Sequence, residues 1–330
     1  MDNEEIQYRK VNPNDVYESL KCSKFKQQQM NAWRPFPTLL STVLIFSIFG
    51  VVCLALGIVM LIYSKKIIEY KVNFDDNNSS IEFEIKENMT APIAVYYEIH
   101  NFYQNHRRYV MSRSNEQMED KKDFKNKSDV DSCKSAQTIK EMKYEGETGN
   151  DEIFKESNYD KIAYPCGLIA KSYKYFNEGF TLQKDNKEIQ INDNDIAWKK
   201  DKELFKDLTN PQHSVQWQSV TDEHFIVWMR PSPFPDFRKL YGRISENLEK
   251  GTYTLNIAKT YFNIEPKDKI KKYFVLTTLN KFGGKNYFLS IAYIVFGSIC
   301  ILLTITVIIY DKIYTSRKHS KRKTRQNIIN

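Results

Sequence analysis

Two long stretches of the chain contain no charged residue, and they separate a polar middle segment from two polar ends. They cover residues 38–63 and 287–310, which makes them 26 and 24 residues long. Because an α-helix rises about 1.5 Å per residue, each stretch exceeds the roughly 30 Å hydrocarbon layer of a membrane. Core helices of soluble proteins rarely run this long without charge. The pattern therefore predicts a membrane protein with two transmembrane helices.

The charges beside the two stretches predict how they cross the membrane. Residues 311–330 carry seven basic residues and one acid, and residues 1–37 carry six basic residues and five acids. Basic residues close to a span favour the cytosol, whereas a long loop is translocated largely regardless of its charge. We therefore predict an N-terminal cytosolic tail over 1–37, a luminal or extracellular domain over 64–286, and a basic cytosolic tail over 311–330. Because residues 1–37 are polar, the first span is expected to be an uncleaved signal anchor.

The middle segment shows the alternation of a half-buried β-sheet. Ile81, Phe83 and Ile85 alternate with charged residues, and similar strands are predicted at 91–99, 252–258 and 273–279. Residues 222–229 also suggest a strand, which ends before a proline-rich stretch, and residues 112–160 suggest a long solvated loop. Strands and helices do not alternate regularly. The predicted ectodomain is therefore α+β, dominated by a sandwich-like antiparallel sheet with short helices and long loops.

Composition adds two expectations about this domain. Aromatic residues make up 14% of the chain, which suits a β-rich core. The net charge of +8 lies mainly in the tail at 311–330, which contributes +6. This tail is expected to lie beside anionic membrane lipids. Nucleic acid is not an expected partner.

The cysteines and glycosylation motifs agree with the predicted topology. Cys133 and Cys166 are the only cysteines within 64–286, whereas Cys22, Cys53 and Cys300 lie outside it. Two thiols in an oxidising compartment are expected to pair, and the loop of about 33 residues predicts a stabilisation of about 3–4 kcal/mol. The N-x-S/T motifs all fall in the predicted ectodomain, at Asn77, Asn78, Asn88 and Asn126.

Motifs of catalysis and metal binding are missing from the sequence. It contains no Gly-x-Ser-x-Gly, no phosphate-binding Walker loop, no His-Glu-x-x-His and no Cys-x-x-Cys. The Asp-Lys-Thr-Gly motif of P-type pumps is also missing, and the four ectodomain histidines have no metal-ligand spacing. We therefore expect no catalytic residues, no metal and no cofactor. Two alternatives remain: a two-span ligand-gated channel subunit that forms trimers, and a membrane-tethered ecto-enzyme.

Both predicted spans carry small residues at helical spacing. Such a stripe lets a second helix approach closely, although ordinary membrane-helix composition produces the same pattern. No ionisable residue interrupts either span, so neither resembles an ion or proton pathway. The stripes are Gly50, Cys53 and Gly57 in the first span, and Ser290, Gly297 and Thr304 in the second.

One segment is too specific for composition to explain. Asn101-Phe-Tyr-Gln-Asn-His-Arg-Arg-Tyr-Val-Met-Ser-Arg113 resembles the signature of the accessory β subunits of type-IV P-type ATPases, the lipid flippases. This is the family named for cell division control protein fifty, also called transmembrane protein thirty. The resemblance covers about residues 25–310. Its other motifs are Phe25-Lys-Gln-Gln-Gln29, Ala32-Trp33, Pro165-Cys-Gly-Leu-Ile-Ala170, Ile196-Ala-Trp198, Phe225-Ile-Val-Trp-Met-Arg230, Phe237-Arg-Lys-Leu-Tyr241, Gly251-x-Tyr253, Gly283-Gly-Lys-Asn286, Phe288-Leu289 and Ile291-Ala-Tyr293.

The resemblance implies a non-catalytic subunit that forms a heterodimer with the ATPase. The ATPase would move phospholipid from the exoplasmic to the cytosolic leaflet, and the β subunit would support its exit from the endoplasmic reticulum, its stability and its working cycle. The complex would then reside in Golgi, endosomal or plasma membranes. A second luminal disulfide found in many relatives is missing here, because residues 73–98 contain no cysteine.

The resemblance also suggests where the ATPase binds. We expect residues 101–113 to form a helix with Phe102, Tyr103 and Tyr109 packed inward and with Arg107 and Arg108 available to the partner. In the membrane, the small-residue faces are expected to contact the ATPase helices. The positions expected to take part are Gly50, Gly57, Gly297 and Thr304.

Overall fold

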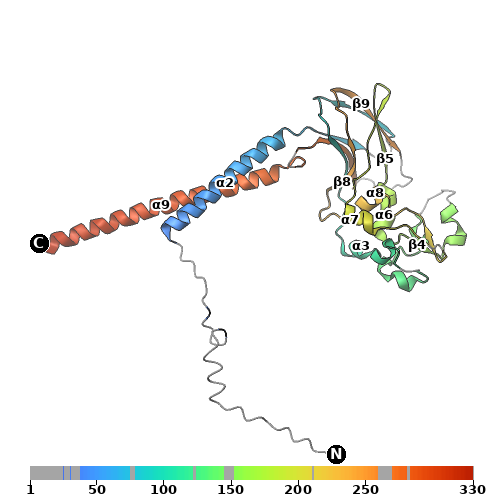
Figure 1. The fold of residues 1–330 in the computed structure, drawn as a ribbon, viewed down its shortest axis with the longest axis horizontal. Helices are drawn as coiled ribbons and strands as arrows, with labels where there is room; N and C mark the ends of the chain where they lie inside the picture. Colours follow the sequence, from blue (N-terminus) through green and yellow to red (C-terminus); the bar gives the residue numbers. More distant parts are fainter. Residues whose placement is uncertain are drawn as a thin grey trace, which may run out of the picture. The chain divides into compact units, whose positions relative to one another are not determined.

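The structure is a computed structural model, in which the chain divides into two compact units (Figure 1). One unit combines residues 1–56 with 292–330, and the other covers residues 57–291. Almost all of the predicted tail at 1–37 lies outside the described residues, as do Asn77 and Asn78. The described residues are 25, 30, 38–74, 79–121, 124–144, 152–209, 212–258, 270–280 and 283–329, with side chains described up to residue 318.

Two long helices confirm the predicted spans. Helix α2 (Leu39–Lys65) has 27 residues and helix α9 (Tyr287–Ile329) has 43, and both are long and apolar enough to cross a membrane. Helix α9 continues beyond residue 310 into the basic tail. Serine and threonine hydroxyl groups in its apolar part bond within the helix; Ser298 and Thr304, for example, donate to the carbonyls of Ile294 and Cys300. The chain is a membrane protein.

Two four-stranded antiparallel sheets confirm the predicted sandwich. Their inner faces meet through aromatic rings: Phe180 lies 5.5 Å from Phe74 and 5.2 Å from Phe274, measured between ring centroids. The predicted strands at 81–85, 91–99, 252–258 and 273–279 all occur. The first sheet has the order β1 (Glu69–Phe74), β10 (Lys271–Thr278), β3 (Ile93–His100), β8 (Phe237–Ile244), and the second has β2 (Ser80–Ile85), β9 (Gly251–Ala258), β5 (Gly179–Lys184), β6 (Lys187–Ile189).

Short helices and one further strand pair complete the ectodomain. Strands β4 (Ile162–Tyr164) and β7 (Ser214–Gln216) pair in parallel, which the antiparallel pattern did not predict. The helices of this region are α3 (Arg107–Met111), α4 (Asn115–Met118), α5 (Ile139–Met142), α6 (Leu168–Phe176), α7 (Lys199–Leu204) and α8 (Glu223–Trp228), with 3-10 turns η1 (Lys127–Cys133), η2 (Glu152–Phe154) and η3 (Glu156–Asn158).

The strand predicted at 222–229 is wrong, because the structure forms helix α8 there. Asp222 caps the helix, and its carboxylate accepts a hydrogen bond from the backbone N–H of His224. Phe225, Trp228 and Met229 are buried at the i, i+3, i+4 spacing of one helix face. A short apolar run fits a helix and a strand equally well, and here the cap decides between them.

The solvated loop predicted at 112–160 is also wrong for the described residues. Apolar side chains recur along this polar stretch and are buried, which anchors a series of short helices. Each short helix packs only one face against the protein, and its other face is in contact with water. Lysine and aspartate on the water-exposed faces therefore dominate the composition of this stretch. The buried apolar residues of this stretch include Met118, Phe124, Val130, Ile139, Met142 and Phe154.

Candidate functional site: the 101–113 segment and its surroundings

The 101–113 segment begins where strand β3 ends, at one end of the first sheet. In the register of β3 with β10, His100 faces Lys271 and Ile93 faces Thr278. Helix α9 follows the Thr278 end of β10, and helix α2 leads into β1 beside Thr277. Seven strand residues at about 3.3 Å each place the segment roughly 23 Å from that end of the sheet.

A loop at the start of the segment is fixed to the proline-rich loop at 231–236. The backbone N–H of Phe102 donates to the carbonyl of Pro235 at 3.0 Å, and the Asn105 side chain donates to the carbonyl of Pro233 at 2.8 Å. The side-chain oxygen of Gln104 accepts from the backbone N–H of Ser232 at 2.9 Å. Prolines lack an N–H but keep a carbonyl, so Pro233 and Pro235 accept hydrogen bonds from the neighbouring loop, while Ser232 donates one.

An aromatic cluster under the segment joins three of the sequence motifs. The ring of Phe102 lies 4.9 Å from that of Phe176 and 6.2 Å from that of Trp228. The indole N–H of Trp228 donates to the carbonyl of Ile169 at 2.9 Å. Burial raises the pKa of Tyr109, although hydrogen bonds such as that with Ser172 act in the opposite direction. These are structural contacts, and they hold helices α3, α6 and α8 together.

The end of the segment packs against the Pro-Cys-Gly motif. Gly167 has a φ of 103°, a backbone conformation that favours glycine. A Cβ at this position would also overlap the backbone carbonyl of Ser112, so there is no room for a side chain. The Ser112 hydroxyl oxygen accepts from the N–H of Leu168 at 2.9 Å. Next to this contact, Cys166 forms the predicted disulfide with Cys133, with 5.8 Å between their Cα atoms. The disulfide prediction is confirmed.

Strand β8 supports the end of helix α8 through a buried lysine. The ammonium of Lys239 donates to the carbonyls of Val227 and Arg230 at the helix terminus. Burial, together with the nearby charge of Arg230, lowers the pKa of Lys239 to about 7. The guanidinium of Arg230 binds Asp201 with bonds of 2.5 and 3.0 Å and lies 4.2 Å from the ring centre of Trp198. This places the Ile-Ala-Trp motif beside the same helix end.

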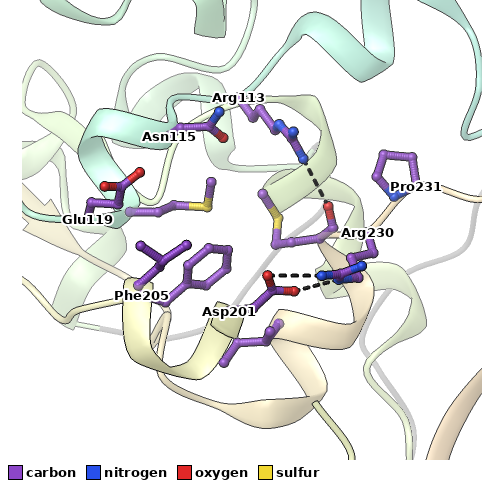
Figure 2. A pocket seen from close by; sticks show the side chains of 11 residues that line it. Arg113, Asn115, Glu119, Asp201, Phe205, Arg230 and Pro231 are labelled. Carbon is purple, nitrogen blue, oxygen red and sulfur yellow. Dashed lines mark hydrogen bonds and ion pairs between the residues drawn. The ribbon is translucent and has the colours of Figure 1, made fainter. Parts of the chain in front are cut away.

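A cavity of about 430 Å³ lies between helices α4, α7 and α8 (Figure 2). In Figure 2 the side chain of Arg113 reaches from its upper edge, and its guanidinium donates to the backbone carbonyl of Met229 at 3.3 Å. On the opposite side, the Arg230–Asp201 ion pair forms part of the wall. The rest of the wall contains the polar side chains Asn115 and Glu119 and the apolar residues Met118, Leu204, Phe205, Ile226, Met229 and Pro231.

Large side chains are exposed on the 101–113 segment and on the proline-rich loop. Tyr103, Met111 and Phe234 are 57%, 66% and 68% exposed. The expectation that Tyr103 packs inward is therefore wrong, and the helix is shorter than expected, since it begins only at Arg107. Arg107 and Arg108 are exposed as expected, and neither has an ion-pair partner within the described residues.

The small residues of the spans are used within this chain. A Cβ at Gly297 would lie 2.9 Å from the Gly50 carbonyl oxygen, and a Cβ at Gly50 would lie 2.7 Å from a side-chain carbon of Ile301. Thr304 and Gly57 are buried as well. At Gly50 and Gly297, helices α2 and α9 contact each other, and a role of these positions in binding the ATPase stays a prediction.

Two of the glycosylation candidates lie within the described residues, and both are exposed. The side-chain oxygen of Asn88 accepts from the backbone N–H of Lys250 at 2.8 Å, which leaves its amide nitrogen at the surface. Asn126 precedes η1, and its backbone N–H donates to Asp129. No group of histidine, cysteine and acidic side chains in the described part of the chain is arranged to bind a metal.

Comparison with known proteins covers nearly the whole chain. The sequence model of the LEM3 (ligand-effect modulator 3) family / CDC50 family matches residues 5–318. ALA-interacting subunit 3 of Arabidopsis thaliana is 32% identical, covering 86% of this chain and 84% of the relative. Cell cycle control protein 50A of Mus musculus is 30% identical over 90% of both chains. The motifs that meet around the 101–113 segment, the two membrane helices and these matches all agree: the chain belongs to the CDC50/LEM3 family.

Proposed function

We propose that this protein is the non-catalytic β subunit of a phospholipid flippase. It forms a heterodimer with a type-IV P-type ATPase, which moves phospholipid from the exoplasmic to the cytosolic leaflet. The observation that carries the proposal is the family match over residues 5–318, which includes both spans and the ectodomain. The name of the Arabidopsis relative states that it interacts with ALA proteins.

The proposed topology has both tails in the cytosol and residues 64–286 on the luminal side. The Cys133–Cys166 disulfide supports this orientation, because disulfides persist in oxidising compartments. The exposed side chains of Asn88 and Asn126 are available for glycosylation on the same side. Helix α9 begins at Tyr287, directly after the ectodomain, and a second crossing there would return the chain to the cytosolic side.

Lipid transport itself is assigned to the ATPase. The apolar stretches 38–63 and 287–310 contain no acidic or basic residue, whereas transport pathways need polar groups within the membrane. The proposed role of this chain is to stabilise the ATPase, to allow its exit from the endoplasmic reticulum and to support its working cycle. Helices α2 and α9 would bind the ATPase as a preassembled pair, through faces other than their glycine contact.

Co-expression with a type-IV ATPase tests the proposal. We expect the tagged full-length chain to purify with the ATPase at equal stoichiometry, and we expect its deletion to retain the ATPase in the endoplasmic reticulum and to abolish uptake of labelled phospholipid. The channel alternative predicts a homotrimer on a native gel. A homotrimer without an associated ATPase would refute the proposed function.

A further inference from the structure

We propose that the junction between the ectodomain and the two membrane helices binds the headgroup of an anionic phospholipid. The site, called the lysine cluster below, is formed by Lys65, Lys66 and Lys285. All three residues belong to the unit at 57–291, together with the adjoining ends of helices α2 and α9. The binding is argued from this unit alone, and only the leaflet in which the lipid lies rests on the proposed function.

The lysine cluster lies at the edge of the membrane. The first uncharged stretch ends at residue 63 and the second begins at residue 287, and all three lysines lie within three residues of these ends. The rings of Tyr63, Tyr287 and Phe288 are exposed at the same level. Aromatic rings gather at the membrane–water interface, and lysine side chains near the end of a span extend towards it. The three ammonium groups are therefore placed at the depth of lipid headgroups.

A hydrogen bond between the two helix ends brings the lysines together. The hydroxyl oxygen of Ser64 accepts from the backbone N–H of Asn286 at 3.0 Å, and Ser64 is buried. The buried hydroxyl of Ser290 donates to the carbonyl of Asn286 at 3.1 Å. Lys65 directly follows Ser64, and Lys285 directly precedes Asn286. The fold thus holds lysines from both helix ends side by side before a ligand binds, which reduces the entropic cost of binding.

The lysine cluster carries positive charge that the described part of the chain does not neutralise. None of the three lysines has a carboxylate partner among the described residues. Glu69, the first acid after helix α2, binds an arginine of strand β8 at 2.8 and 3.0 Å. Lys66 and Lys285 lie over the rings of Tyr63 and Tyr287, 5.9 and 5.4 Å from the ring centres. Such contacts leave the N–H groups of the ammonium available to an anion.

Two glycines leave space for the headgroup beside Lys285. A Cβ added at Gly283 or Gly284 would meet no atom of the described residues within 4 Å. Gly283 has a φ of 94° and exchanges two backbone hydrogen bonds with Asn280, at 3.0 and 3.3 Å, which fixes the backbone beside this space. The Gly283-Gly-Lys-Asn286 motif therefore supplies the open space, one ammonium and the residue that joins the helix ends.

The charge of the cluster selects the class of lipid. Ammonium groups bind phosphate and carboxylate oxygens through charge-assisted hydrogen bonds, so a headgroup with a net negative charge is favoured over a zwitterionic one. In the proposed topology the cluster lies in the exoplasmic leaflet. Anionic phospholipid would then be enriched beside the partner, in the leaflet from which the ATPase takes its lipid.

The test uses the full-length chain, reconstituted without the ATPase in phosphatidylcholine vesicles. A small fraction of phosphatidylserine, with a photoreactive group near its glycerol, is added and activated by light, and labelled peptides are mapped by mass spectrometry. A phosphatidylcholine analogue with the same group is used in parallel. Peptides that contain the lysine cluster are thereby read separately from those of the basic tail at 311–330, which is itself expected to attract anionic lipid.

Two variants remove different parts of the site. Lys65→Gln with Lys66→Gln and Lys285→Gln removes the charge, whereas Gly284→Phe keeps the charge and fills the open space. Unchanged melting temperature and disulfide formation establish that each variant folds. The matched control loses the same charge at exposed positions beside the other end of the second span, and it combines Lys312→Gln, Arg317→Gln and Lys318→Gln.

We expect the phosphatidylserine analogue to label the wild-type junction about tenfold more than the phosphatidylcholine analogue does, because each basic residue near the surface attracts anionic lipid. Both junction variants should reduce this labelling to the level of phosphatidylcholine while the tail peptides stay labelled. The control at the other end of the span should keep full labelling of the junction.

Four outcomes would overturn the inference. Equal labelling of the junction in the wild type and both variants, or by both analogues, would show that the cluster does not select anionic lipid. Competition by soluble glycerophosphoserine as strong as that by unlabelled phosphatidylserine would indicate a site for free anions. Loss of labelling when the ATPase is bound would show that the partner covers the cluster. These results leave the proposed function intact, whereas failure to co-purify with any ATPase would refute that function and leave the labelling unchanged.

Discussion

Removal of the Cys133–Cys166 disulfide should destabilise the ectodomain by a predictable amount. Replacing both cysteines with alanine removes the cross-link without adding a polar group to the buried cluster that contains Phe124, Val130 and Ile162. The cysteines are 33 residues apart, and the chain-entropy relation for a loop of this size gives about 3–4 kcal/mol. The free energy of unfolding should fall by that amount.

The loss of stability should be largest in residues 124–144, the segment that the disulfide links to the end of strand β4. Backbone contacts also hold this segment, since Ala163 donates to the carbonyl of Gln137 and Gly167 donates to that of Ala136, both at 2.9 Å. We therefore expect the alanine variant to fold but to expose residues 124–144 to protease more often than the wild type. Opening of this segment requires a small part of the global unfolding energy when the cross-link is gone.

Chemical unfolding of the full-length protein in detergent provides the measurement. Trp217 reports on this region, because its indole N–H donates to the carbonyl of Pro165, next to the disulfide. The control is the wild-type protein treated with reductant, which should lose the same stability. A loss below about 1 kcal/mol in both would refute the chain-entropy reasoning and show that native contacts in the reduced unfolded state already restrict the loop.

Three further predictions concern other parts of the molecule. Hydrogen bonds from Lys71, His100 and Arg238 outweigh the opposing effect of burial and lower the pKa of Glu98 from 4.5 to about 2. Its contribution to stability should therefore be complete above pH 4.5 and be lost as the pH falls towards 2, and Glu98→Gln should flatten this part of the profile of melting temperature against pH. Gly167→Ala should destabilise the ectodomain by at least about 1–2 kcal/mol in denaturant titrations, since it combines a positive φ with overlap at Ser112, whereas alanine at the open position Gly284 should have little effect. Gly297→Leu should separate helices α2 and α9 and lower the yield of folded protein, while Ile299→Ala on an exposed helix face should not, and equal yields in detergent would contradict the tight contact.

Sequence patterns predicted the structure correctly where a local pattern is compatible with only one arrangement of the chain. Uncharged stretches of 26 and 24 residues have few alternatives to a membrane span. The alternation around Phe83 allows only one face of a strand to be buried, and two ectodomain cysteines leave one pairing. The order of the motifs also identified the family, which the comparison over residues 5–318 confirmed.

Tertiary structure decided everything that depends on which distant segments meet. The run at 222–229 forms a helix because Asp222 caps it and because its buried face packs near helix α6, and neither fact is visible in local apolarity. The small-residue stripes allow close approach of any helix, and only the structure shows that Gly50 and Gly297 contact each other within this chain. The cavity brings Arg113, Phe205 and Met229 together from segments far apart in sequence. Sequence spacing carries no signal for such a site, because its shape is set by packing among elements and not by the periodicity of any one of them.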